Sequence, residues 1–178
     1  MGMKRRFKVM IGAAALLVAG FAMPYSFRNP VEGATVNDYN QKSFWYYPWG
    51  TSVTHKGVDI FKKKGTPIHA ASGVEWVLYA GEMPGKGGNV VITLAPKWRL
   101  HYYAHMDEVT ATPLSVVTHN STLGTVGNTG NAATTPSHLH FGIGTIYPRI
   151  WDMDYDHHGE RKAFYLNPIP YLNEHSDK

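Results

Sequence analysis

The segment SHLHF (137–141), taken together with HKGVD (55–59) some eighty residues earlier, carries the clearest structural signal in the sequence. Successive side chains of a strand alternate between its faces, so His138 and His140 are predicted to project side by side. The earlier stretch adds an imidazole and a carboxylate four residues apart. Two histidines and one aspartate are the ligand set of a catalytic zinc, with the fourth position left to water. A further histidine beside that water can act as a base, so the pattern indicates an enzyme.

Two histidines two residues apart are ambiguous by themselves, because the chain has ten histidines and such a pair also suits the polar face of an ordinary strand. The surroundings favour a site. The segment GTVGNTGN (124–131) predicts a short strand and a glycine-punctuated loop just before the pair. Upstream, HYYAHM (101–106) places another histidine at the end of an aromatic strand.

Six segments resemble, in order and spacing over residues 50–145, the lysostaphin/LytM-type zinc metallopeptidases (peptidase family M23), which cut peptide bonds in bacterial peptidoglycan. They are HKGVDI (55–60), GTPIHAASGV (65–74), GNVVITL (88–94), YYAHM (102–106), GTVGNTGNA (124–132) and SHLHFGI (137–143). The resemblance implies one Zn²⁺ per chain, held by His55, Asp59 and His140. It implies catalytic roles for His105 and His138, of which either could be the general base. The chain departs from the family at Gly142, where a glutamate is common; no ligand or base position is lost.

The other histidines are expected to be exposed or satisfied within the core: His69, His119 and His175. If 99–105 is a strand, His101 shares a face with Tyr103 and His105, and it is the residue most easily confused with the site histidines.

Composition predicts one domain with a β-rich core. The chain has 178 residues, 13% of them aromatic and 17% charged, with 18 glycines and 11 prolines. Apolar runs separated by glycine and proline predict strands over 74–80, 89–94, 99–105, 114–118 and 138–144. The expected fold class is mainly β: a single antiparallel-sheet domain of the lysostaphin/LytM type, with long loops forming an open groove. The absence of cysteine excludes a cysteine zinc site, a thiol nucleophile and a cysteine-linked lipid anchor.

The net charge of +4 comes entirely from the N-terminus. Residues 1–23 hold four of the 17 Lys and Arg and none of the 13 acids, so residues 24–178 have 13 of each sign. A formally neutral domain argues against nucleic-acid binding. The cations Lys4, Arg5, Arg6 and Lys8 precede an apolar run over 9–23, which is typical of a secretory signal or short membrane anchor; a core helix is the alternative. We therefore expect export to the periplasm, with a slight preference for an uncleaved anchor in the inner membrane.

The sequence is predicted to contain three regions. They are a signal or anchor over 1–23, a linker or loosely draped arm over 24–43, and the catalytic domain over 44–178. The aromatic segment FWYYPWG (44–50) is interpreted as core or a domain-capping plug, or as a groove wall. In the second interpretation the substrate contacts are Trp45, Tyr47 and Trp49, together with Asn128 and Asn131. In the tail, 151–158 suits a polar loop better than a second metal site, and 164–172 an extended segment that packs on the domain.

The expected function is a zinc endopeptidase acting on peptidoglycan stem peptides or cross-links, with the D-alanyl cross-link favoured over glycine bridges. One alternative is a catalytically silent LytM-like module that binds and activates cell-wall amidases; such relatives lack ligand residues that this chain retains. A metal-independent sugar-binding β-domain would explain the aromatic residues but not the spaced histidines and aspartate. The sequence identifies no protein regulator.

Overall fold

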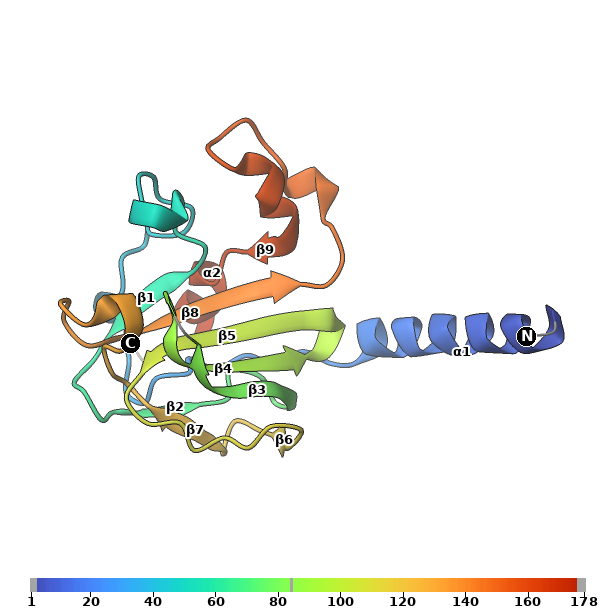
Figure 1. Ribbon diagram of the computed structural model, residues 1–178, viewed down its shortest axis with the longest axis horizontal. Coiled ribbons are helices and arrows are strands. Elements are labelled where there is room, and N and C mark those ends of the chain that lie inside the picture. Colours follow the sequence, from blue (N-terminus) through green and yellow to red (C-terminus); the bar gives the residue numbers. More distant parts are fainter. Residues whose placement is uncertain (1–2, 84, 176–178) are drawn as a thin grey trace.

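The protein is built on a seven-stranded antiparallel sheet, shown in Figure 1. The structure is a computed structural model that describes residues 3–83 and 85–175. Six strands follow one another across the sheet and β9 (Tyr165–Leu166) pairs with the outer part of β8. Their order is β1 (Val58–Phe61), β8 (His138–Thr145), β5 (Arg99–Met106), β4 (Gly88–Ala95), β3 (Glu75–Met83) and β6 (Val116–Val117). The expected strands are thus present, although the one predicted over 114–118 is only two residues long.

A smaller sheet covers one face of the large one. It pairs β2 (Pro67–His69) with β7 (Thr122–Thr125), which Figure 1 shows next to the large sheet. The hydrophobic core fills the space between the two sheets; Ile68 and Leu123 contribute from the small sheet, and Tyr103 and Phe141 from the large one. All four side chains are fully buried, which gives the large sheet a rigid inner face.

The opposite face of the large sheet carries a groove. Successive side chains of each strand alternate between the core and this outer face. Leu139, Phe141 and Ile143 of β8 belong to the core, whereas His140, Gly142 and Gly144 line a groove on the outer face. The neighbouring β5 follows the same rule: Tyr103 is in the core, while Leu100, Tyr102 and Ala104 line the groove. One face of these strands therefore holds the fold together and the other is available to a ligand.

The segment 24–43, expected to be a linker or loose arm, is packed tightly as part of the domain. Phe27, Val31 and Tyr39 are each at most 5% exposed and belong to the main core. Isolated bridges join Phe27 to Ser72, Val31 to Ile68 and Tyr39 to Ile60. The expectation of looseness was wrong because apolar residues spaced irregularly along an extended chain can still each meet the core.

The C-terminal segment also differs from expectation. Instead of remaining extended over 164–172, the chain forms the short strand β9 and then the helix α2 (Ile169–His175). Ile169 and Leu172, three residues apart, point into the core. Short 3₁₀ helices occupy several loops: η1 (Val36–Asp38), η2 (Gly50–Ser52), η3 (Pro96–Trp98), η4 (Gly130–Ala132), η5 (Ile150–Asp152) and η6 (Gly159–Phe164).

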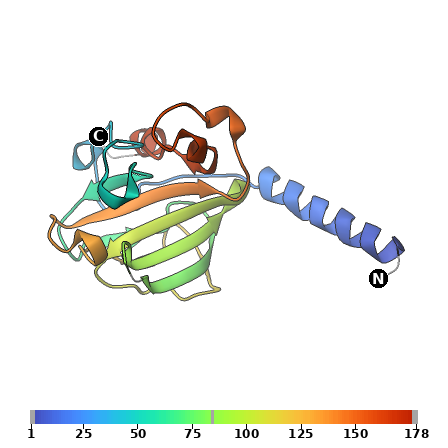
Figure 2. The same cartoon turned by 45° about the horizontal axis from the view of Figure 1, so that its top comes forward.

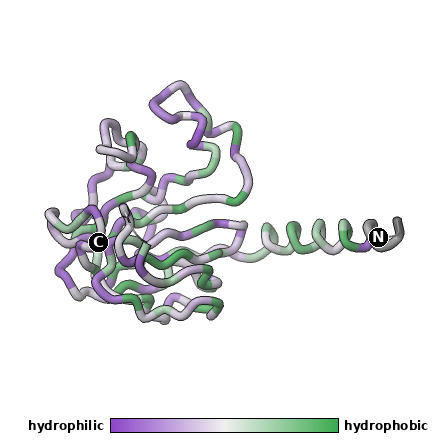
Figure 3. The backbone as a smooth tube through the Cα atoms, viewed as in Figure 1, coloured by the Kyte–Doolittle hydropathy of each residue, from purple (hydrophilic) through white to green (hydrophobic). Residues whose placement is uncertain are grey.

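The N-terminal run forms the helix α1 (Met3–Ala22), which extends away from the domain in Figures 1 and 2 and is largely hydrophobic in Figure 3. It is no core helix, since side chains such as Phe7 (63% exposed) and Leu16 (64%) face outward. Its last turns contact η3, where the Trp98 indole donates to the Leu17 carbonyl. Within the described residues, we find no helix whose length and apolar character would suffice to cross a membrane.

Candidate metal centre and groove

Two adjacent strands place the predicted ligands together. In the pairing of β1 with β8, Asp59 lies directly opposite His140. Asp59 Oδ1 is 2.8 Å from His140 Nδ1 and 3.1 Å from His55 Nε2, and the two ring nitrogens are 3.1 Å apart. Among the residues that the structure describes, these three form the one group of His, Cys, Asp or Glu side chains whose ligand atoms converge closely enough to hold a metal ion.

His55 comes from the loop before β1 and is fixed by the aromatic segment. Its backbone N–H donates to the Tyr46 carbonyl and its carbonyl accepts from the Trp45 N–H. Its ring donates from Nδ1 to the Ser43 carbonyl at 3.0 Å, which leaves the lone pair of Nε2 directed at Asp59. The Trp49 ring stacks on the imidazole with centroids 4.1 Å apart, so His55 is only 1% exposed.

The close approach of His140 also requires a glycine. A Cβ atom on Gly57 would lie 2.5 Å from the Phe141 carbonyl oxygen and 2.9 Å from His140 Nε2. The glycine in HKGVD thus makes room for the ligand of the neighbouring strand. The sequence offered no separate signal for this role.

The pKa shifts of Asp59 and His140 favour the binding of a cation at this centre. Burial alone would raise the pKa of Asp59, but hydrogen bonds and charge interactions with His140 and His55 outweigh it and hold that pKa far below its ordinary value. Burial lowers the pKa of His140, against the opposing influence of Asp59. Asp59 is therefore held as a carboxylate, beside a His140 imidazole that burial biases toward its neutral form.

The donor set fits zinc. Three ligand atoms at about 2.0–2.1 Å from a tetrahedral Zn²⁺ would be about 3.3 Å apart, close to the separations found here. The Nδ1–H of neutral His55 already donates to the Ser43 carbonyl. At most one further proton, on His140 Nδ1, then remains for the three atoms that contact one another: His55 Nε2, His140 Nδ1 and Asp59 Oδ1. A bound cation would satisfy all three at once, and nitrogen and oxygen ligands of this kind suit zinc.

The two predicted catalytic histidines lie beside the ligands. The ring centroids of His105 and His138 are 5.1 Å apart, and His138 Nε2 is 4.0 Å from Asp59 Oδ2. His105 donates from Nδ1 to the Thr129 carbonyl (2.9 Å), and His138 donates from Nδ1 to the Pro136 carbonyl (2.8 Å). Each ring thus keeps Nε2 as a proton acceptor. Burial first, and then the charges of His140 and His138, lower the pKa of His105 to about 4.

His105 reaches the groove through a break in the strand. It was expected to share a face with His101 and Tyr103, but those two are fully buried whereas His105 lines the groove. The backbone of His105 is left-handed, with φ +64°, and this reverses the alternation at the end of β5. Such a conformation costs on the order of 1–3 kcal/mol and is typical of functional sites.

The groove has a volume of about 750 Å³ and runs over the outer face of β4, β5 and β8. Of the proposed substrate contacts, Trp49 and Asn131 line it. Trp45 does not: it is 8% exposed, donates from its indole to the His157 carbonyl and fits the capping interpretation. Tyr47 stacks on His157, and Asn128 donates to the Ala133 carbonyl; neither lines the groove. No residue of the arm over 24–43 is among the described residues that line it.

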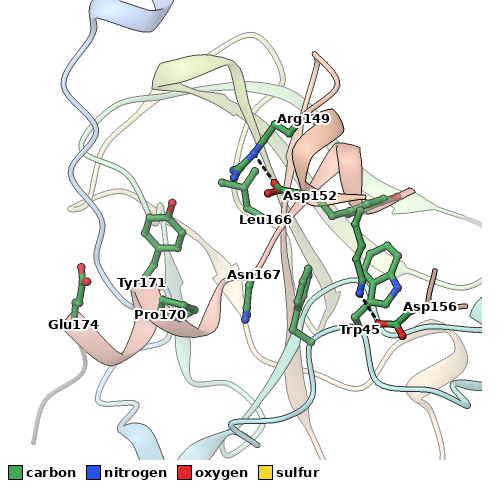
Figure 4. A pocket seen from close by; sticks show the side chains of 12 residues that line it. Trp45, Arg149, Asp152, Asp156, Leu166, Asn167, Pro170, Tyr171 and Glu174 are labelled. Carbon is green, nitrogen blue, oxygen red and sulfur yellow. Dashed lines mark hydrogen bonds and ion pairs between the residues drawn. The ribbon is translucent and has the colours of Figure 1, made fainter. Parts of the chain in front are cut away.

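A second cavity, of about 710 Å³, lies beyond Trp45 and Tyr165 and is shown in Figure 4. The acids predicted to form a polar loop gather around it and are paired with cations. Arg149 contacts Asp152 at 2.7 Å, and Lys162 bridges Asp154 and Asp156. These pairings agree with the polar-loop interpretation of 151–158.

The remaining histidines are remote from the centre. His101 is buried beside Glu75, with Nδ1 2.9 Å from the carboxylate. His69 lies 3.6 Å from Glu32, His119 contacts Ser26, and His175 donates to the Tyr171 carbonyl. The Glu75–His101 pair, which also bonds Tyr103, was not anticipated, because a single glutamate at the start of a strand carries no local signal of burial.

Comparison with solved structures finds the same fold in several peptidases. The catalytic domain of the antimicrobial peptidase lysostaphin from Staphylococcus simulans aligns with a TM-score of 0.60 and 24% identity, over 76% of this chain and 93% of that one. A putative glycyl-glycine endopeptidase LytM from Ruminococcus gnavus aligns with a TM-score of 0.63 and 21% identity, over 95% and 68%. A zinc-containing peptidase from Vibrio cholerae gives 0.53 and 23%, over 66% and 36%. The chain spans about half (53%) of a longer lysostaphin structure.

A search of curated protein sequences gave no match. The model of peptidase family M23, however, matches residues 53–150, which include all three candidate ligands and both candidate catalytic histidines. This match covers more than half of the 178 residues and confirms the resemblance predicted from the sequence. The chain belongs to peptidase family M23.

Proposed function

We propose that this protein is a zinc-dependent endopeptidase that hydrolyses peptide bonds in peptidoglycan stem peptides or cross-links. The observation that carries the proposal is the convergence of His55, Asp59 and His140 within 3.1 Å, at a groove also lined by His105. Zinc bound by these residues would supply Lewis-acid chemistry, acidifying water and polarising the scissile carbonyl. Membership of a peptidase family supports hydrolysis of a peptide bond as the reaction.

The chain's own groups supply the proton transfers. His105 and His138 each hold Nδ1–H on a backbone carbonyl, so their Nε2 atoms are fixed in the acceptor form. One of them accepts the proton of the attacking water and, once protonated, can donate from Nε2 to the developing oxyanion; the other accepts a hydrogen bond from that water and orients it. Trp49, stacked on His55, shields one side of the centre from solvent.

Within this class we favour the D-alanyl cross-link over a glycine bridge. The groove is lined by apolar and aromatic side chains such as Ile92, Leu100, Tyr102 and Phe164, which offer contacts to substrate side chains. Glycine residues have no side chains to bury there. The favoured substrate is a polymer of the cell wall, so we also propose that the protein is exported and works in the periplasm.

The test is digestion of purified cross-linked muropeptides by the zinc-loaded full chain, with products identified by mass. We expect dimers joined by D-alanyl bonds to be cleaved to monomers, and glycine-bridged dimers to be cleaved more slowly. Dimers that stay intact at full zinc occupancy would defeat the proposal. Tight muropeptide binding without cleavage would favour the alternative, a silent module that activates amidases.

A further inference from the structure

The charged side chains among the described residues that line the groove are positive. Among the described residues that line it are Lys56 and Lys86, and none is an aspartate or glutamate. Residues 24–178 have equal numbers of basic and acidic residues, so this asymmetry is local to the groove. Gly142 lies on the same wall and contributes no side chain.

The two lysines meet at the corner next to the metal centre. Lys56 directly follows the ligand His55, and its Nζ donates to the carbonyls of Ser52 and Thr54 at 2.8 and 3.2 Å. Lys86 reaches over from the connection between β3 and β4, and its Nζ donates to the Thr51 carbonyl at 3.3 Å. Both ammonium groups are therefore held on one short loop, 51–54, which precedes His55.

Among the described residues, neither lysine is paired with a carboxylate. The ion pairs of these residues involve other lysines and arginines, whereas Lys56 and Lys86 contact neutral groups: backbone carbonyls and, for Lys56, the Trp45 ring, whose centroid is 5.8 Å from Nζ. An unpaired pair of cations at the edge of a partly apolar groove attracts an anionic group of the ligand.

We propose that Lys56 and Lys86 form a carboxylate-binding corner that selects peptides carrying a free carboxylate beside the scissile bond. This inference rests on the proposed function. In a D-alanyl cross-link to a diamino acid, the carbon bonded to the amide nitrogen can carry a free carboxylate. An internal glycine bridge has no such charge, and amidation of the carboxylate removes it without changing its size.

The test compares two cross-linked peptides that differ only in a carboxylate or carboxamide on the carbon next to the scissile nitrogen. With the zinc-loaded full chain, we expect kcat/KM to favour the carboxylate by about tenfold, the size expected of two partly exposed charge interactions. The preference is expected to weaken as salt is raised. Lys86→Gln should reduce the ratio to about threefold, and Lys86→Glu should bring it to one or reverse it.

Lys63→Gln is the matched control, because Lys63 is exposed and lies outside the groove; it should keep the wild-type ratio. Lys56→Gln should act like Lys86→Gln, with its zinc content measured alongside, since it adjoins His55. Equal cleavage of both peptides by the wild type, or an unchanged ratio in Lys86→Glu, would overturn the inference and leave the proposed function standing. Failure to cleave either peptide would overturn the proposed function and this inference with it.

Discussion

The histidines of the centre differ in whether their Nδ1 atom donates a hydrogen bond to a backbone carbonyl. His55, His105 and His138 each donate from Nδ1 to a main-chain carbonyl, of Ser43, Thr129 and Pro136 respectively. This fixes the tautomer, so that Nε2 remains the acceptor nitrogen; in the proposed function it would bind the metal at His55 and meet the attacking water at His105 and His138. His140 instead turns Nδ1 toward Asp59. Backbone carbonyls thus determine the roles that the spacing of the histidines only suggests.

Removal of any one ligand should abolish stoichiometric zinc. We expect about one zinc per wild-type chain and steeply lower affinity in His55→Ala, Asp59→Ala and His140→Ala, because two ligands cannot complete a tetrahedral site. Metal analysis after dialysis measures this. His69→Ala, remote from the centre, is the control and should retain zinc. Full occupancy in His140→Ala would show that the ligand assignment is wrong.

Removal of either neighbouring histidine should spare the metal but not the reaction. His105→Ala and His138→Ala are expected to bind zinc like the wild type while losing turnover by about 10²–10⁴, the usual contribution of acid–base catalysis. Zinc content and single-substrate kinetics, measured on the same preparations, separate the two effects. Loss of zinc from His138→Ala would mean that His138 and His140 exchange the roles of ligand and base.

At the scale of elements, the alternation of side chains along a strand explains why the core and groove residues of β8 were predictable. In β8, the period of two places Leu139 and Phe141 in the core and His140 on the groove, as expected of a half-buried strand. The same rule failed for His105, because the left-handed backbone at that residue reverses the side-chain direction. A sequence pattern carries no signal for one unusual φ angle at a strand end.

Long-range packing accounts for the other differences. Phe27 and Val31 lie in a segment without strand or helix periodicity, and their burial depends on contacts with β2 and with the loop before β3. Trp45 and Trp49 share one aromatic segment, yet one caps the core and the other lines the groove. The local sequence could not distinguish them, since the partner that holds Trp45 in its capping position, the His157 carbonyl, lies more than a hundred positions away, whereas Trp49 stacks on the nearby His55.

The buried Glu75 joins β3, β4 and β5, and should make stability depend on pH. Burial alone would raise its pKa, but interactions with His101, Thr93 and the Ser72 N–H together lower it below the ordinary 4.5. Tyr103 also donates to this carboxylate. A lowered folded-state pKa stabilises the protein above about pH 4.5, and the contribution disappears as the pH falls through the folded-state value.

We therefore expect Glu75→Gln to lower the free energy of unfolding by about 1–3 kcal/mol at pH 7, since it leaves buried partners less well satisfied. Its difference from the wild type should narrow as the pH falls below about 4.5 and the wild-type carboxylate becomes protonated. Urea unfolding across this range measures the effect. Glu82→Gln, exposed on the same strand, should show almost no difference at any pH. A Glu75→Gln difference that stays constant with pH would contradict the argument.

At the scale of the whole molecule, α1 and the metal centre lie at different ends of the sheet. β8 begins at His138 and ends at Thr145, whose partner on β5 is Arg99, next to η3. His140 is thus five residues, or roughly 17 Å, from the end at which α1 contacts η3. Figure 1 shows α1 leaving the domain on that far side. An attachment through α1 would hold the candidate metal centre away from the attached end of the sheet.

The N-terminal segment is expected to attach the domain to the inner membrane. Lys4, Arg5, Arg6 and Lys8 precede the apolar run in the sequence, and basic flanks remain on the cytoplasmic side, so the domain is expected to face the periplasm. Because residues 24–178 are formally neutral, net charge would not hold the enzyme to an anionic surface; attachment must come from the apolar side chains that α1 exposes. Retention of the helix would also keep the hydrogen bonds from Lys97 and Trp98 to the Phe21 and Leu17 carbonyls.

We therefore expect the protein to be recovered in the membrane fraction with its N-terminal segment intact, as determined by N-terminal sequencing of the membrane and soluble periplasmic fractions. A soluble form beginning near residue 23 would contradict retention and leave export standing, whereas cytosolic protein starting at Met1 would contradict both.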